Sequence, residues 1–184
     1  GVQTCALPLG ANVPWITYEA ENMVNHGGTI LGPHYLPDLP ATEASGRHCV
    51  RLNVVGQNLE FVAQAPANAL VVRYCVPDTA GGGADYTLSL YQNGAFLQKL
   101  PLTSKYSWLY GAYPFTNSPA AGSPRNFFDE VRVLGLTINS NDTIRLAKDT
   151  DDTASYYLID LVDLENVSPP LTQAANSLSI RSEE

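Results

Sequence analysis

Glu19 and Glu21, two glutamates with a single residue between them, are the first candidates for chemistry in the sequence. They end a strand-like apolar run, and residues i and i+2 of a strand point to the same face of a sheet. Two carboxylates on one face suit a single cation, and Ca²⁺ takes roughly six to eight oxygen ligands, backbone carbonyls included. A solvated polar face is the alternative, which the pair alone does not exclude.

The second candidate is the aromatic segment of residues 106–126, which mixes rings with Gly, Pro, Asn and Ser. Aromatic rings stack on the apolar C–H faces of sugars, while amides bond sugar hydroxyls. Trp108, Tyr110 and Tyr113 could form such a platform, with Asn117 as a hydrogen-bonding partner and Tyr35 contributing from another loop. Rings that anchor a long loop to the core are the alternative.

Hydrolytic chemistry is poorly represented in the sequence. A glycosidase needs two carboxyl groups facing each other about 5–5.5 or 6.5–9.5 Å apart. Asp129 and Glu130 lead straight into a strand beside Arg125 and Arg132, which favours a structural role. No Gly-x-Ser-x-Gly elbow, His-Glu-x-x-His pair or phosphate loop occurs. We therefore expect no catalysis by this chain.

The elements that must position these residues are β-strands. No apolar stripe of 3.6-residue period lasts three turns, whereas short β-branched runs alternate with turn residues. Asn93-Gly94 between two apolar runs predicts a type I′ hairpin. The sequence thus predicts an all-β, antiparallel β-sandwich with long loops over Gly27–Ser45 and Tyr106–Asn126. The predicted strands are Trp15–Glu19, His48–Val54, Leu59–Ala63, Leu70–Val76, Tyr86–Tyr91, Phe96–Leu102, Val131–Leu136, Thr143–Leu146 and Tyr156–Leu164.

Composition excludes some partners. The net charge is −8 and the ten Lys and Arg residues occur singly, so nucleic acid is not an expected partner. No apolar run reaches the roughly 20 residues that cross a bilayer, so no membrane is expected either. Cys5, Cys49 and Cys75 allow at most one internal disulfide, which we expect to involve Cys5. Sequons at Asn141 and Asn166 permit a secreted origin.

Two motifs resemble carbohydrate-binding modules of families 6 and 35. Tyr18-Glu19-Ala20-Glu21-Asn22 resembles their opening strand, and Asp160-Leu161-Val162-Asp163-Leu164 resembles their last strand. The resemblance implies a jelly-roll, galactose-binding-like sandwich with a structural Ca²⁺. Its ligands would be Glu19, Glu21 and Asp160, plus a backbone carbonyl near Arg47. It also implies a sugar cleft at Trp108 and Tyr110.

One position departs from the family 6 pattern. The amide that usually precedes the calcium aspartate is missing, because Tyr156-Tyr157-Leu158-Ile159 stands there. Asp151 or Asp152 could replace it as a sugar contact. Asp149, Asp151 and Asp152 could also form a second calcium site, although simple solvation of an acidic loop is the plainer interpretation.

A closer resemblance links the chain to modules attached to parallel β-helix glycosidases of the α-1,3-glucanase and mycodextranase group. It is carried by Glu43–Arg47, Val72–Asp78 and Thr103–Gly111. We expect residues 1–168 to form a binding module, and residues 169–184 a linker and the start of a truncated downstream domain. The predicted function is a secreted, monomeric, non-catalytic module that binds a polysaccharide or oligosaccharide and targets an attached catalytic domain. A structural sandwich that only packs against that domain is the alternative.

Overall fold

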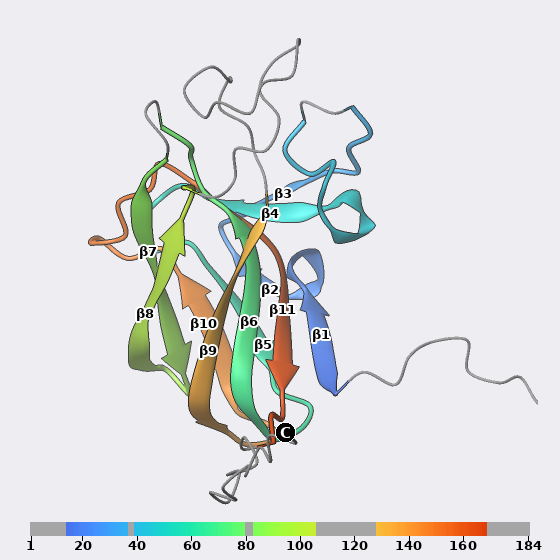
Figure 1. Ribbon diagram of the computed structural model, residues 1–184, viewed down its shortest axis with the longest axis vertical. Helices are drawn as coiled ribbons and strands as arrows, with labels where there is room; N and C mark the ends of the chain where they lie inside the picture. Colours follow the sequence, from blue (N-terminus) through green and yellow to red (C-terminus); the bar gives the residue numbers. More distant parts are fainter. Residues whose placement is uncertain (1–13, 37–38, 80–82, 106–127, 169–184) are drawn as a thin grey trace, which may run out of the picture.

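The computed structural model describes residues 14–36, 39–79, 83–105 and 128–168. These residues form two antiparallel sheets packed face to face (Figure 1). Sheet A has six strands, in the order β3-β4-β11-β6-β9 with β1 also paired to β11, and sheet B has five, in the order β2-β5-β10-β7-β8. The predicted all-β antiparallel sandwich is confirmed.

The strand bounds follow the predicted runs closely. Sheet A contains β1 (Trp15–Glu19), β3 (Thr29–Leu31), β4 (Cys49–Leu52), β6 (Ala67–Cys75), β9 (Asp129–Ile138) and β11 (Tyr157–Glu165). Sheet B contains β2 (Val24–His26), β5 (Asn58–Val62), β7 (Asp85–Gln92), β8 (Ala95–Thr103) and β10 (Thr143–Ala147). Two short 3-10 turns, η1 (Ala20–Asn22) and η2 (Ser45–Arg47), complete the regular structure. No helix among the described residues is long and apolar enough to cross a membrane.

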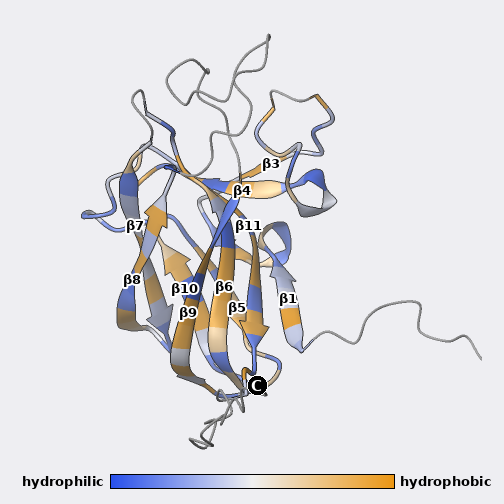
Figure 2. Cartoon of the chain, viewed as in Figure 1, coloured by the Kyte–Doolittle hydropathy of each residue, from blue (hydrophilic) through white to orange (hydrophobic). Residues whose placement is uncertain are grey.

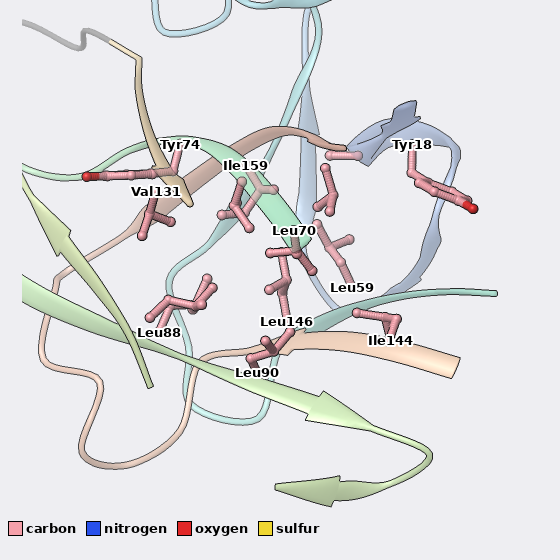
Figure 3. Close-up of a cluster of buried hydrophobic side chains, with 14 of the residues drawn as sticks. Tyr18, Leu59, Leu70, Tyr74, Leu88, Leu90, Val131, Ile144, Leu146 and Ile159 are labelled. Carbon is pink, nitrogen blue, oxygen red and sulfur yellow. The ribbon is translucent and has the colours of Figure 1, made fainter. Parts of the chain in front are cut away.

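The core lies between the sheets and is made by alternate residues of each strand. Leu70 and Tyr74 of β6 point into it, as do Leu88, Leu90 and Leu146 of sheet B (Figure 3), and Val72 belongs to the same cluster. Hydrophobic and hydrophilic residues follow one another along the strands (Figure 2), as expected of strands with one face in the core and one outside it. Burying these side chains is the main force holding the two sheets together.

The β7–β8 hairpin turns through Asn93 and Gly94, as predicted. Both residues have positive φ, at 51° and 80°, which is the type I′ geometry that matches strand twist. The side chain of Asn93 also donates to Asp142 at 2.8 Å, which ties the hairpin to the β9–β10 turn.

The predicted long loop at Gly27–Ser45 is only partly a loop. Residues 29–31 form β3, which pairs with β4, while the neighbouring residues 24–26 form β2 on β5. Strands of three residues show too little alternation to stand out in a sequence. The loop therefore begins after Leu31, and its second half, residues 39–47, lies against sheet A beside the start of β4 (Figure 1).

We name residues 39–47 the strap. Its Ala41 and Ala44 pack on Cys49, Cys75 and Leu158 in a small second core. Val50 and Ile159, the sequence neighbours of these strand residues, face the main core. Because side chains alternate along a strand, the strap covers the outer face of sheet A.

Candidate functional site

Asp160 of β11 is the centre of the site predicted to hold a cation. It sits at a register shift between Ile159 and Leu161 and is fully buried beneath the strap. Its carboxylate accepts the backbone N–H of Ser45 at 2.9 Å and pairs with the Arg73 guanidinium. Burial raises the pKa of Asp160 to about 6, although Arg73 and the Ser45 amide lower it. A carboxyl held this way is poorly compensated for its charge.

Glu19 and Glu21 reach the same region from the end of β1 and from η1. Ser45 Oγ donates to Glu19 Oε1 at 2.9 Å, and a Cβ placed on Gly46 would lie 3.7 Å from Glu21 Oε1. The Oε2 atoms of both glutamates are buried and have no hydrogen-bond partner among the described residues. The prediction that both glutamates lie on one strand was wrong for Glu21, which lies in the 3-10 turn η1. The turn still directs its side chain to this region.

We call Glu19, Glu21 and Asp160 the carboxylate cluster. Within the described residues its one ion pair is that of Arg73 with Asp160, and Arg73 also donates to the carbonyl of Glu43 at 2.9 Å and lies over the ring of Phe128. One guanidinium leaves excess negative charge in a poorly solvated place, which is unfavourable unless a further cation compensates it. The donor set, all oxygen and acidic, fits a hard divalent ion such as Ca²⁺.

Arg47 was predicted to supply a carbonyl to the ion. It has φ of 60°, and its carbonyl accepts the N–H of His34 at 3.2 Å. Its guanidinium donates to the carbonyl of Thr42 at 3.2 Å and lies 5.3 Å from the centre of the Tyr35 ring. Arg47 thus braces the strap, and its carbonyl keeps one lone pair for another partner.

A second acidic group lies on the loop before β11. The carboxylate oxygens of Asp149, Asp151 and Asp152 lie within 4.8 Å of one another. In the described part of the chain no other group of three metal-binding side chains is this close together, and the carboxylate cluster is not. Gathering ligands at the carboxylate cluster therefore requires side-chain adjustment. The loop group is already compensated by Lys99, which contacts Asp151 at 2.6 Å and Asp152 at 2.8 Å.

Asp152, a predicted sugar contact, is 1% exposed. Its oxygens accept from Thr87 at 2.7 Å, Ser89 at 2.8 Å and the amide of Asp149 at 2.9 Å, besides Lys99. Burial alone would raise its pKa, but these donors hold the pKa of Asp152 below its ordinary value. The side chain organises its loop and has no surface to offer a sugar.

The other predicted sugar contacts are mostly beyond what the structure describes. Trp108, Tyr110, Tyr113 and Asn117 lie outside the described residues. Tyr35 is 70% exposed, with Arg47 near its ring. An exposed ring braced by a guanidinium is compatible with stacking on a ligand, and Tyr35 stays a predicted contact.

Three residues that organise these sites were missed from the sequence. Arg73 interrupts the apolar run Leu70–Val76 at an outward position, and a lone arginine in a buried strand signals a buried acidic partner. Lys148 is 6% exposed and donates to the carbonyls of Asp152 at 2.6 Å and Ala154 at 2.7 Å. Ser45 had no signal of its own, because its role depends on the strap's position.

The fold defines the protein's class as a two-sheet antiparallel β-sandwich with an acidic cluster between its first and last strands. Comparison with known families is more specific. Residues 12–167 match the family described as α-1,3-glucanase catalytic domain D1. The chain belongs to this family. A comparison with curated proteins found no match.

Solved structures agree with the family assignment. The Agl-KA catalytic domain is 31% identical, with a TM-score of 0.82 over 91% of this chain and 30% of that chain. The catalytic domain of a GH87 α-1,3-glucanase in complex with nigerose is 33% identical, with a TM-score of 0.76 over 90% and 30%. The catalytic unit of the thermostable GH87 α-1,3-glucanase from Streptomyces thermodiastaticus strain HF3-3 is 36% identical, with a TM-score of 0.72 over 91% and 29%. This chain spans about 30% of the length of these structures.

The prediction of a non-catalytic carbohydrate-binding module of the family 6/35 type was wrong. Both predicted functions, the targeting module and the accessory sandwich, assumed that the chain is not part of a catalytic domain. The matching family and the solved structures are catalytic domains. The motifs misled because Glu19, Glu21 and Asp160 belong to the sandwich scaffold, and a scaffold serves many functions. Solved relatives do bind oligosaccharides, namely nigerose and tetrasaccharides.

Proposed function

We propose that this chain is the β-sandwich part of the catalytic unit of an enzyme that hydrolyses α-1,3-glucan. The family match over residues 12–167 carries the proposal, and TM-scores of 0.72–0.82 to solved α-1,3-glucanase catalytic domains and units support it. Hydrolysis needs two carboxyl groups that face the glycosidic bond. Asp152 and Asp160 are buried and bonded within the sandwich, so we assign them to structure and not to bond cleavage.

The test uses the full-length protein that contains this chain. Incubated with α-1,3-glucan, it should release reducing ends, and chromatography should show short α-1,3-linked oligosaccharides. Parallel incubations with α-1,4-, α-1,6- and β-1,3-glucans should release far less. Hydrolysis of another glucan in preference to α-1,3-glucan would overturn the substrate assignment, and no hydrolysis of any glucan would overturn the enzyme assignment.

For the carboxylate cluster, the proposal is a structural divalent cation, with Ca²⁺ the best fit. Glu19, Glu21 and Asp160 would hold it, with the Arg47 carbonyl as a further oxygen ligand. The buried Oε2 atoms of both glutamates, which have no partner among the described residues, support the proposal. So does the fact that, in the described part of the chain, the three carboxylates make a single ion pair, between Asp160 and Arg73. When bound, the ion would neutralise the cluster and fasten η1, the strap and β11 to one another. It takes no part in the hydrolytic step.

Calorimetric titration of the chelator-treated protein with Ca²⁺ and with Mg²⁺ tests the cation. Saturable binding of one Ca²⁺ that the double variant Glu19→Gln/Glu21→Gln loses would support the site. Binding that the double variant retains would place the ion elsewhere, and the acidic loop at Asp149 would be the next location to examine.

The ligand of the catalytic unit is proposed to be an α-1,3-glucan oligosaccharide. Tyr35 is the candidate contact within the described residues. Trp108, Tyr110, Tyr113 and Asn117, which lie outside them, stay candidates from the sequence alone. In the full-length enzyme, Tyr35→Ala should raise KM with little change in kcat, because an exposed stacking ring contributes binding and no chemistry. An unchanged KM would remove Tyr35 from the substrate path. A polymeric substrate also calls for a secreted enzyme, which fractionation of culture medium and cells would check.

A further inference from the structure

The strap is held on sheet A by few apolar contacts and by several polar ones. Its apolar contribution is small, since Ala41 and Ala44 are the strap residues buried against Cys49 and Leu158. Each alanine adds only one methyl group to the contact, so apolar burial holds the strap weakly compared with the main core.

Polar ties make up the difference, and they converge on the carboxylate cluster. Ser45 N–H donates to Asp160 at 2.9 Å, and Ser45 Oγ donates to Glu19 at 2.9 Å. Arg73, paired with Asp160, donates to the carbonyl of Glu43 at 2.9 Å. All three ties depend on groups at the cluster or directly paired with it.

The other hydrogen bonds of the strap are internal or join it to the neighbouring loop residues His34, Leu36 and His48. The amide of Thr42 donates to Leu39, that of Ala44 to Ala41 and that of Arg47 to Ala44, at 3.0–3.2 Å. The internal bonds survive if the strap moves away from the sheet, because donor and acceptor move together. A segment with its own turns, few apolar contacts and clustered ties has the properties of a separately opening unit.

We infer that the strap opens as one unit from the outer face of sheet A while the sandwich stays folded, and that a cation at the carboxylate cluster holds it closed. The second half of this inference rests on the cation proposed above. The ion would bind between the groups that tie the strap down, so the closed form binds it better and its binding shifts the population toward closure.

Cys49 provides a reporter. Its thiol is fully buried under the strap. A thiol with no exposed surface does not meet iodoacetamide, so alkylation requires the strap to be open.

The experiment measures alkylation of Cys49 by iodoacetamide at pH 8, quantified on its peptide by mass spectrometry, in EDTA and in millimolar Ca²⁺. In EDTA, labelling should be faster than global unfolding allows and nearly independent of low urea concentrations. Ca²⁺ should slow labelling at least tenfold. Ser45→Ala, which loses the tie to Glu19 and keeps the amide tie, should label about fivefold faster in EDTA, the typical effect of one lost hydrogen bond. Ser140→Ala, in an exposed turn with its own bond to Gln64, is the matched control and should label like the parent.

Three results would overturn the inference. Labelling in EDTA that follows the urea dependence of global unfolding would show that the strap opens only with the sandwich. A melting temperature raised by Ca²⁺ with unchanged labelling would leave the cation site standing and remove its link to the strap. Ca²⁺ with no effect on either would remove the cation and the closure mechanism together, while hydrolysis of α-1,3-glucan is tested separately.

Discussion

Glu21→Gln is the most discriminating substitution at the carboxylate cluster. Glutamine keeps the size of the side chain and removes one charge. Without Ca²⁺ the variant should be as stable as the parent or more stable, because one uncompensated charge near Asp160 disappears. With Ca²⁺ it should be less stable than the parent, because a ligand is lost.

The size of the effect follows from binding linkage. An ion that binds only the folded state at 100 times its Kd stabilises that state by about 2.7 kcal/mol. For a domain of this size, that corresponds to a rise of about 5–10 °C in melting temperature. Glu21→Gln should abolish most of this rise, since the oxygen it alters, Oε2, is buried and has no other partner among the described residues.

Differential scanning fluorimetry in EDTA and in Ca²⁺ measures both arms. Asp151→Asn is the matched control, because Asp151 is an exposed carboxylate that pairs with Lys99 and is not a member of the carboxylate cluster. It should leave the Ca²⁺-dependent rise intact. The reasoning fails if Ca²⁺ raises the melting temperature of Glu21→Gln as much as that of the parent, or if Glu21→Gln destabilises the protein equally with and without Ca²⁺.

Three further predictions concern the scaffold. The folded-state pKa of Asp152 is lowered, so its ionised form contributes stability above about pH 4 that is lost as the pH falls. In urea unfolding, Asp152→Asn should therefore lower the free energy of unfolding by about 2–3 kcal/mol at pH 7 and by clearly less near pH 3. An equal loss at both pH values would contradict this. Lys148→Met should cost about 2 kcal/mol at pH 7, since it leaves two buried carbonyls without their donor; a neutral change would show that water replaces it. Gly32→Ala should lower the melting temperature more than Gly56→Ala. Both positions have positive φ, but only a Cβ at Gly32 would meet backbone, 2.2 Å from the Arg47 carbonyl oxygen. Equal losses in melting temperature would mean that the strap shifts freely to make room for the methyl group.

Much of the fold could be predicted from the sequence. The alternation in β5, β7 and β10 and the Asn93-Gly94 turn are local signals, and local signals specify strands and hairpins. The pairing of β1 with β11 could be expected only from the family resemblance, because those strands lie far apart in the sequence. The two three-residue strands were missed because their neighbours, and not their own residues, make them strands.

The site was less predictable than the fold. Glu19 and Asp160 were found through motifs, but Arg73 and Ser45 act through contacts that the strap creates. From the sequence, Asp152 looked like a loop carboxylate open to a ligand. In the structure it is paired with Lys99 of β8, which is distant in the sequence. The predicted function failed for a different reason: the recognised residues build the scaffold, and the scaffold alone does not show whether the sandwich stands apart from a catalytic unit or belongs to it.

The pairing of β1 with β11 has a consequence for how such a sandwich is assembled into longer proteins. Trp15 lies opposite Glu165, so the path into the sandwich and the path out of it are adjacent. A folded unit whose entry and exit points adjoin can be inserted into a host loop, or removed from it, with little disturbance to the host. Joined through these two points, the sandwich would behave as an insertable domain that can be moved between host proteins.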